Sequence, residues 1–309
     1  MMLSNTQNLR ITHHGIKLLP IYSVIGGTSS EDLAKKISKK LKSKFIKCDL
    51  RVFPDGESKI TLEGIPKGQI IVVQSIYPPV DSNLVRALAL VSQARKHSSK
   101  VFVVIPYLGY ARQDRAFLPG EIITMDLVAK MFKAAGASKI IVVDIHSMIA
   151  LDHLQIPATN VSAVGELVNY FKKLKLKDSL IVSPDKGGIE RAKNFAKSFG
   201  TDYIYLEKHR DRKTGEVTIK STNHHEVKGR DLIIVDDMIS TGGSIVKAAQ
   251  YLKKQKCGKI YACCTHALLI GDAEIKIRKA GVAKIISTNS VPCKTNTVDI
   301  SSIIAKALV

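Results

Sequence analysis

The sequence predicts an α/β fold in which two mainly parallel β-sheets are each flanked by helices. Short runs rich in β-branched residues, such as IIVV at 70–73 and LIIV at 232–235, are almost continuously apolar, as is typical of strands covered on both faces. Each run is followed by a loop and then by a stretch with helical apolar spacing, which favours a parallel sheet. The length of 309 residues indicates two domains, at about 150 residues per domain.

The pattern predicts nine strands, and between them it predicts helices. Apolar residues spaced three and four apart, for example Leu33, Ile37 and Leu41, mark the first helix. In parallel sheets, ligands bind beyond the carboxyl ends of the strands, so the residues after each strand are the candidates for a site. The predicted strands are Ile21–Ile25, Gln69–Gln74, Lys100–Ile105, Lys139–Asp144, Ser179–Ser183, Asp202–Leu206, Asp231–Val235, Lys259–Cys264 and Ala283–Thr288.

The domain boundary is expected near the stretch QIPATNVSAVG at 155–165, where Pro157 and polar residues interrupt the pattern. We therefore expect an N-terminal domain over 19–157 and a C-terminal domain over 158–309. Residues 1–18 are expected to form a disordered extension. The segments 70–83 and 232–245 resemble each other loosely, which hints at a duplicated unit.

Composition narrows the class of protein. The 45% hydrophobic and 24% charged content is that of a globular chain and argues against disordered, collagenous and disulfide-scaffold classes. No apolar run reaches the roughly 18 residues that cross a bilayer, so no membrane association is expected. The N-terminus lacks the pattern of a signal peptide, and we expect the cytoplasm as the compartment. The five cysteines include no CxxC pair and are expected to be free thiols.

The charge balance is strongly basic. Lys and Arg number 47 against 27 Asp and Glu, a net charge of +20. Such a surplus favours nucleic acid, an acidic membrane surface or small phosphorylated molecules as partners, but it equally describes a lysine-rich solvated surface. Charge alone does not separate these interpretations, and we do not expect nucleic acid to be a partner.

The segment DLIIVDDMISTGGS at 231–244 carries the clearest chemical pattern. A buried strand leads to two acids, Asp236 and Asp237, and the chain then turns through two glycines into a helix. Glycines allow a phosphate to approach backbone N–H groups at the positive end of a helix, and the two acids suit the hydroxyls of a sugar. A generic strand–turn–helix connection is the structural alternative. The loop residues that this pattern singles out are Ser240, Thr241, Gly242, Gly243 and Ser244.

This segment resembles the ribose-phosphate loop of type I phosphoribosyltransferases. Four further segments resemble one branch of that superfamily, the ribose-phosphate pyrophosphokinases (PRPP synthetases), and occur in the same order. They are FPDGE at 53–57, YARQDR at 110–115, DIH at 144–146 and SPDKGG at 183–188. The resemblance implies two tandem type I phosphoribosyltransferase-like domains, with ATP held by the first and ribose 5-phosphate by the loop of the second. The IST-GG form of the loop, with Ser240 where bacterial and mammalian members generally carry Asp, resembles archaeal members.

The resemblance implies an ATP site that neighbouring subunits share, and hence a homo-oligomer of at least two chains. Without the resemblance, Asp55-Gly56 fits a hairpin turn as well as it fits an ATP site. The arginines of YARQDR likewise fit surface cations. No Walker A sequence is present, so the nucleotide must be held by other means. The implied ATP-binding residues are Phe53, Asp55, Gly56, Glu57, Arg112, Gln113 and Arg115.

The resemblance also implies a magnesium site and a catalytic loop. His146 and Asp185 become the magnesium-site residues, although His146 alone is more often structural and a carboxylate suits the hard cation better. Lys208 and Arg210, within LEKHRDR, become catalytic residues on a mobile loop that closes over the phosphates, and Arg210 also contacts ribose 5-phosphate. In isolation this Lys/Arg cluster is also typical of a solvated surface.

The function implied is that of a ribose-phosphate diphosphokinase, which makes 5-phosphoribosyl 1-diphosphate and AMP from ribose 5-phosphate, ATP and Mg²⁺ and thereby supplies nucleotide biosynthesis. Two alternatives stay open. A phosphoribosyltransferase would share the 231–244 loop but has no use for FPDGE and YARQ. A non-catalytic regulatory subunit of the synthetase would keep the fold and lose the catalytic groups.

Overall fold

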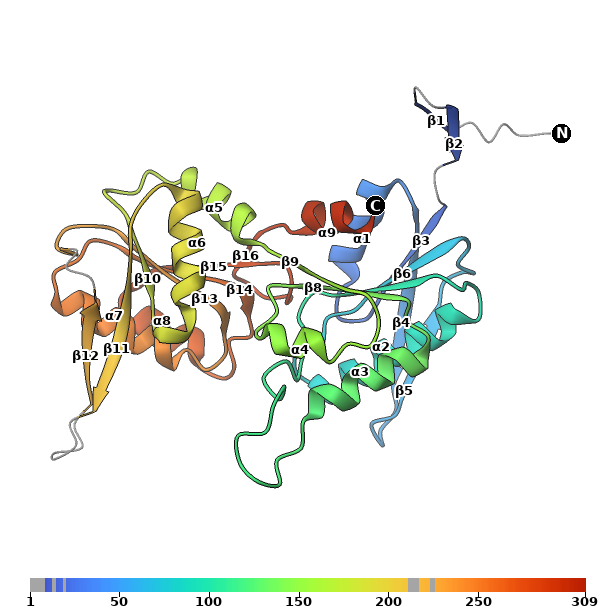
Figure 1. Cartoon of the computed structure of the whole chain (residues 1–309), viewed down its shortest axis with the longest axis horizontal. Helices are drawn as coiled ribbons and strands as arrows, with labels where there is room; N and C mark the ends of the chain where they lie inside the picture. Colours follow the sequence, from blue (N-terminus) through green and yellow to red (C-terminus); the bar gives the residue numbers. More distant parts are fainter. Residues whose placement is uncertain (1–8, 13–14, 19–20, 211–216, 223–225) are drawn as a thin grey trace. The chain divides into compact units, whose positions relative to one another are not determined.

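A computed structural model of the chain describes residues 9–12, 15–18, 21–210, 217–222 and 226–309. The chain divides into two compact units, of which the first comprises residues 1–160 and 301–309 and the second residues 161–300. Each unit contains one seven-stranded sheet with helices on its faces (Figure 1).

The first unit is built on a sheet with the order β5-β4-β3-β6-β7-β8-β9. All the described strand pairs are parallel except β4 with β5, which form an antiparallel hairpin at the edge. Its strands are β3 (Tyr22–Gly26), β4 (Lys44–Val52), β5 (Ser58–Leu62), β6 (Gln69–Val73), β7 (Val101–Ile105), β8 (Lys139–Val143) and β9 (Ala158–Val161).

Helices cover both faces of this sheet. Ile70 and Val72 of β6 pack in one core with α2 and α3, while the alternate residues Ile71 and Val73 are equally buried on the opposite face, where α1 packs. The near-continuous apolar strands follow from this double coverage. The helices are α1 (Glu31–Leu41), α2 (Val80–Arg95), α3 (Thr124–Ala135), α4 (Met148–Asp152) and, from the end of the chain, α9 (Ser301–Leu308).

The second unit repeats the plan. Its sheet has the order β12-β11-β10-β13-β14-β15-β16, again with one antiparallel pair, β11 with β12, at the edge. The strands are β10 (Leu180–Ser183), β11 (Tyr203–Arg210), β12 (Val217–Thr222), β13 (Leu232–Ile239), β14 (Ile260–Ala267), β15 (Val282–Thr288) and β16 (Asn296–Val298). The helices are α5 (Val164–Lys172), the 3₁₀ turn η2 (Lys186–Gly188), α6 (Ile189–Phe199), α7 (Gly243–Lys254) and α8 (Ala273–Lys279).

The two sheets have the same order of strands when β3 is matched with β10, β6 with β13 and so on to the edge. The duplication hinted at by the segments 70–83 and 232–245 is therefore present in the topology, because these segments form β6–α2 and β13–α7. All nine predicted strands are found, with ends shifted by up to four residues. The hairpin strands β4 and β5, the antiparallel edge strand β12 and the short edge strands β9 and β16 were not predicted, since their sequences are not continuous apolar runs.

The helices that follow the last strand of each sheet pack in the other unit. After β9 the chain enters α5, whose Phe171 meets Phe195 of α6 and Tyr261 of β14 edge to face, with ring centroids 6.0 Å apart in both pairs. After β16 the chain enters α9, which packs on α1 of the first unit. The last nine residues thus belong with the first unit, although the sequence suggested one continuous C-terminal domain from residue 158.

The N-terminal extension, expected to be disordered, contains a two-stranded antiparallel pair of β1 (Leu9–Thr12) and β2 (Gly15–Leu18). The rest of residues 1–18 lies outside the described residues. Among the described helices, none is both long and apolar enough to cross a membrane.

Packing of α9 on α1 predicts that the chain end stabilises the first unit. Ile304 is fully buried, and Ile304→Ala should cost about 2–5 kcal/mol of unfolding free energy because the cavity refills only partly. Urea denaturation of the purified protein measures this cost. Lys306→Ala, on the exposed side of the same helix, is the control and should leave the midpoint unchanged. Equal midpoints for Ile304→Ala and the control would contradict the packing.

Candidate functional site

The carboxyl end of β13 brings together the two acids that the sequence singled out. Asp236 and Asp237 lie within the strand rather than after it, since β13 continues to Ile239. The Asp236 side chain is 21% exposed and that of Asp237 is 5% exposed. Arg191 of α6 places Nη1 3.1 Å from Asp236 Oδ1 and 3.5 Å from Asp237 Oδ1. One guanidinium therefore contacts both carboxylates.

Asp237 and burial together shift the ionisation of Asp236. Burial, which is the largest cause, and the hydrogen bond and charge of Asp237 together raise the pKa of Asp236 to about 8, although Arg191 opposes the shift. The backbone N–H of Asp237 also donates to Asp236 Oδ1 at 2.9 Å. The pair thus forms a compact set of oxygen acceptors whose charge depends on burial, on the mutual contact of the two acids and on Arg191.

The loop from Ser240 to Ser244 joins β13 to α7. Gly242 has φ +76°, and a Cβ there would lie 2.8 Å from Cδ1 of Ile277, so this position requires glycine. The first hydrogen bond of α7 runs from Val246 N–H to Gly242 O at 2.9 Å. The N–H groups of residues 243–245 precede that bond and are the free amides of a helix N-terminus, which favour an anion.

The neighbouring connection after β14 fixes the start of this loop. The backbone N–H groups of Leu268 and Leu269 both donate to Ile239 O at 3.0 Å, and that of Ile270 donates to Ser240 O at 3.0 Å. These bonds use the carbonyl groups of the last strand residue and the first loop residue, and so hold the start of the loop in place.

Asp185 lies after β10, the strand next to β13. Its Oδ1 accepts from Gly187 N–H at 2.9 Å and from Gly188 N–H at 3.3 Å, so the carboxylate caps the turn η2. A Cβ at Gly188 would lie 2.5 Å from Ser183 Oγ and 3.6 Å from Nη1 of Arg191. A side chain at Gly188 would therefore clash with Ser183, whereas its distance from the Arg191 guanidinium is an ordinary contact.

No group of three or more His, Cys, Asp or Glu side chains that would hold a metal by itself occurs among the described residues. Mg²⁺ in enzymes that handle phosphates is usually held by one or two carboxylates, water and the substrate's phosphates. Asp185 supplies one such carboxylate, and its second oxygen is not used in capping η2. The donor set near β10 therefore fits a magnesium ion that substrate phosphates complete.

Lys208 and Arg210 were expected on a mobile loop, but both belong to strand β11. Lys208 pairs with Ile219 and Arg210 with Val217 of β12. The sequence between these two strands, 211–216, lies outside the described residues. The expected strand ended at Leu206, whereas β11 extends four residues further as one arm of an antiparallel ribbon.

In the first unit, FPDGE forms the turn of the hairpin between β4 and β5. Phe53 N–H donates to Glu57 O and Gly56 N–H to Phe53 O, both at 2.9 Å, and Glu57 N–H donates to Asp55 Oδ1 at 3.1 Å. Asp55, Gly56 and Glu57 are exposed, and the guanidinium of Arg51 lies 4.9 Å from the centre of the Phe53 ring. The hairpin interpretation is correct, and it leaves two carboxylates and an aromatic ring at an accessible tip.

The segment YARQDR follows β7. Arg112, Gln113 and Arg115 are exposed, whereas Asp114 between them is buried. Ser147 Oγ donates to Asp114, and this hydrogen bond, with help from Arg115, keeps the pKa of Asp114 below its usual value despite burial. The buried acid anchors a segment that presents two guanidinium groups outward, as phosphate binding requires.

His146 lies after β8 in the same unit and is exposed. Asp144 just before it adopts φ +38°, and the N–H of Ile145 between them is held by Asn160 Oδ1 at 3.0 Å. The backbone here is constrained while the imidazole is accessible. The ATP-side candidates thus belong to the first unit, and the ribose-side candidates and Asp185 to the second.

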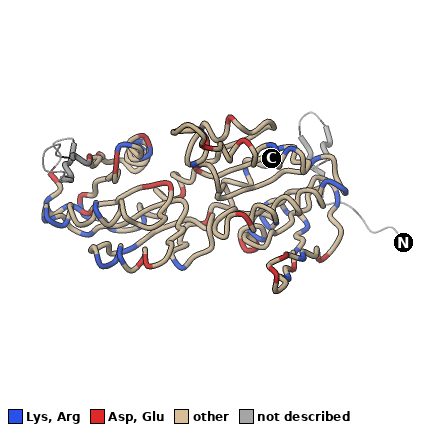
Figure 2. Tube along the Cα trace, turned by 90° about the horizontal axis from the view of Figure 1, so that it is seen from below, with Lys and Arg blue, Asp and Glu red and all other residues tan. Residues whose placement is uncertain are grey.

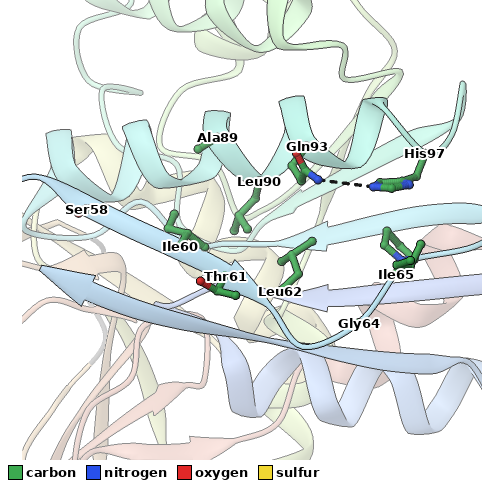
Figure 3. Close-up of a pocket in the computed structure, with 11 residues that line it drawn as sticks. Ser58, Ile60, Thr61, Leu62, Gly64, Ile65, Ala89, Leu90, Gln93 and His97 are labelled. Carbon is green, nitrogen blue, oxygen red and sulfur yellow. Dashed lines mark hydrogen bonds between the residues drawn. The ribbon is translucent and has the colours of Figure 1, made fainter.

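A separate hollow of about 670 Å³ lies between β5 and α2 (Figure 3). Ile60, Leu62 and Leu90 line it, and the Gln93 side chain is 3.5 Å from His97 Nε2 at one end. No charged side chain and none of the predicted site residues lines it. A neutral, largely apolar lining does not suit phosphates, so this hollow is not the predicted site.

Comparison with known proteins identifies the family. The family model for the "N-terminal domain of ribose phosphate pyrophosphokinase" matches residues 22–136, and that for the "phosphoribosyl transferase domain" matches residues 160–297. The chain belongs to the ribose-phosphate pyrophosphokinase family. Family members so named include that of Sulfurisphaera tokodaii, 35% identical over 92% of this chain and 99% of its own, and that of Methanobrevibacter smithii, 36% identical over 92% and 99%.

The fold agrees with that of a solved family member. The crystal structure of the phosphoribosylpyrophosphate synthetase from Mycobacterium smegmatis matches with a TM-score of 0.83 at 26% identity, covering 93% of this chain and 97% of the other. The predicted family and the predicted pair of phosphoribosyltransferase-like domains are therefore confirmed, as is the resemblance to archaeal members.

Arg191 is the residue that sequence reasoning missed. It lies six positions beyond Asp185 in an ordinary amphipathic helix, where an arginine is usually part of the solvated face. The signal that was available is its position three residues after the SPDKGG segment, in the first turn of the helix.

Glycine 242 offers a test of the loop geometry. Gly242→Ala should lower the unfolding free energy by about 1–3 kcal/mol, because the left-handed backbone and the contact with Ile277 both oppose a side chain. Gly243→Ala is the matched control, since no heavy atom lies within 4 Å of its Cβ position. Urea unfolding compares the two, and equal losses would contradict the loop conformation.

The raised pKa of Asp236 predicts a pH-dependent stability. The folded state holds this proton up to about pH 8, whereas the unfolded chain releases it near pH 4, so stability should fall as the pH rises between these values. Asp236→Asn should flatten the decline in urea midpoint between pH 5.5 and 8.

Asp272→Asn is the control for that measurement. The hydrogen bond from Lys276 lowers the pKa of Asp272, so its contribution is lost only at more acidic pH. Its variant should keep the wild-type slope between pH 5.5 and 8. A wild-type slope in Asp236→Asn would show that burial does not raise this pKa.

Proposed function

We propose that this chain is a ribose-phosphate diphosphokinase that converts ATP and D-ribose 5-phosphate into AMP and 5-phospho-α-D-ribose 1-diphosphate for nucleotide biosynthesis. The observation that carries the proposal is the β13–α7 connection, in which two acids and a glycine turn precede free helix amides. The two family models, which match residues 22–136 and 160–297, support the same activity.

The ribose 5-phosphate site follows from that connection. The phosphate binds at the amides and hydroxyls of Ser240–Ser244, including Thr241, Gly242 and Gly243, where partial positive charge is concentrated. Asp236 and Asp237 accept hydrogen bonds from the sugar hydroxyls. Arg210 contributes a further cation to the phosphate.

ATP is held by the first unit. Arg112, Gln113 and Arg115 contact the nucleotide and its phosphates. The hairpin tip of Phe53, Asp55, Gly56 and Glu57 binds the adenine of a neighbouring chain, and the exposure of three of these four residues supports a role toward another molecule. The active form is therefore a homo-oligomer, at least a dimer.

In the reaction, the C1 hydroxyl oxygen of ribose 5-phosphate attacks the β-phosphorus of ATP. The new C1–O–Pβ bond forms, and the bond between the β-phosphorus and the α,β-bridging oxygen breaks. AMP leaves with that oxygen, and the hydroxyl proton passes to water. Positioning and charge stabilisation supply the catalysis, as in other phosphoryl-type transfers. Lys208 and Arg210 neutralise the negative charge that develops on the transferred group and the leaving oxygen.

Asp185 and His146 are the residues that would hold Mg²⁺, with Asp185 the better suited ligand. The ion would neutralise phosphate charge and align the diphosphate. We further propose that the protein works in the cytoplasm. The basic residues are spread along both units in Figure 2, which fits small anionic substrates and a solvated surface without requiring nucleic acid as a partner.

Phosphorus NMR of the purified protein with ribose 5-phosphate, ATP and Mg²⁺ tests the activity. AMP and a new C1-diphosphate signal are expected. Intact ATP with retained binding of ribose 5-phosphate would indicate a regulatory subunit. ADP would indicate an ordinary kinase, and a chain that consumes the diphosphate together with a base would be a phosphoribosyltransferase.

The role of Lys208 has its own test. Lys208→Ala should reduce kcat by about 10²–10³-fold, because one charge that stabilises the transition state is lost, while the KM values change little. Lys254→Ala, an exposed lysine in the last turn of α7, is the control and should retain wild-type turnover. Near-normal kcat in Lys208→Ala would remove this lysine from the mechanism.

A further inference from the structure

The guanidinium of Arg191 has no place in the roles described so far, although it touches the ribose-side acids directly. Its Nη1 is within 3.5 Å of an oxygen of both Asp236 and Asp237, and its side chain is only 25% exposed. It comes from α6, whereas both acids come from β13. A contact made across two elements, in a mostly buried setting, is more constrained than a surface ion pair.

The negative charge of the proposed substrate gives the contact between Arg191 and the two acids a role in binding. Ribose 5-phosphate brings a phosphate with up to two negative charges next to a pair of acids that carries negative charge of its own. At short distance in a partly buried site, each pair of like charges is unfavourable because the effective dielectric is lower than in water. Arg191 keeps its positive charge at all relevant pH values and lies against both acids.

We propose that Arg191 is a positioning residue for ribose 5-phosphate: it holds the Asp236 and Asp237 carboxylates together as an acceptor pair for the sugar hydroxyls and offsets their charge against the sugar phosphate. The inference rests on the proposed function in that it takes ribose 5-phosphate as the ligand. Arg191 acts through the two acids and need not touch the reacting atoms.

The turn that precedes α6 is held by two local features. Gly188, directly before α6, has no room for a side chain, because a Cβ there would lie 2.5 Å from Ser183 Oγ. Asp185 caps the same turn through Gly187 and Gly188. The SPDKGG segment thus provides the turn that directs the first residues of α6, and with them Arg191, toward the end of β13.

Direct binding of ribose 5-phosphate, measured by titration calorimetry, tests the inference independently of turnover. Arg191→Gln should weaken binding roughly 10- to 100-fold, the range expected when a charge-assisted hydrogen bond is lost. In steady-state assays the KM for ribose 5-phosphate should rise while the KM for ATP stays within about twofold. Arg191→Lys keeps the positive charge but loses the planar guanidinium that contacts two acids at once. This variant should therefore recover part of the affinity.

Arg230→Gln is the matched control. Arg230 also pairs with an acid of the second unit, with Nε 3.2 Å from Asp178 Oδ2, but it lies at the amino end of the strands, before β13 begins. Loss of Arg230 should leave ribose 5-phosphate binding unchanged. This result would separate a role of Arg191 at the site from a general effect of losing an ion pair in the second unit.

The outcomes distinguish this inference from the proposed function. Wild-type affinity in Arg191→Gln, tighter binding in that variant, or equal weakening in Arg230→Gln would overturn the role of Arg191. A wild-type protein that binds ribose 5-phosphate without forming AMP would refute the proposed activity and leave the role of Arg191 intact. A wild-type protein that does not bind ribose 5-phosphate would overturn both.

Discussion

The covering of both faces of each sheet is the constraint on which the rest of this structure depends. Strands such as β6 and β13 are apolar on both sides, and each must be shielded by helices from above and below. The connections then have to run over the faces, and the carboxyl ends of the strands remain as the edge where backbone amides and polar side chains are free. The candidate residues Asp185, Asp236 and Asp237 lie along that edge of the second sheet.

The same constraint explains where the helices that follow β9 and β16 pack. Each sheet ends in a short strand, β9 or β16, and the helix that follows it covers a face in the other unit. Helix α5 supplies Phe171 to the aromatic contacts of the second unit, and α9 supplies Ile304 to the first. The second unit is the continuous stretch 161–300, whereas the first unit depends on a segment from the far end of the chain, residues 301–309.

The duplicated halves differ at the equivalent sheet edge. Where β13 carries Asp236 and Asp237, the chain after β6 carries Gln74 and Ser75, both fully buried. Gln74 Oε1 accepts from the N–H of Ser29 at 3.3 Å, and a Cβ at Gly27 would fall only 2.0 Å from that oxygen. Neutral side chains thus fill this edge in the first unit, whereas in the second unit the edge carries two acids and a cation, and Asp236 is partly accessible. The same sheet edge is therefore packed with neutral side chains after β6 and forms the proposed substrate site at the end of β13.

The sequence by itself determined the nine strands with continuous apolar runs, the glycine turn at 240–244 and the family, because these depend on neighbouring residues and on motifs of fixed spacing. The assignments of Phe53, Arg112, His146 and Lys208 to ATP, metal and catalysis remain predictions. Only the tertiary structure showed that Arg191 joins both acids, that α9 returns to the first unit and that β11 continues through Arg210. The physical reason is that these features arise between elements distant in the chain: an ion pair between a helix and a strand, a helix on a remote face and an edge strand held by its partner leave no periodic trace in the local sequence.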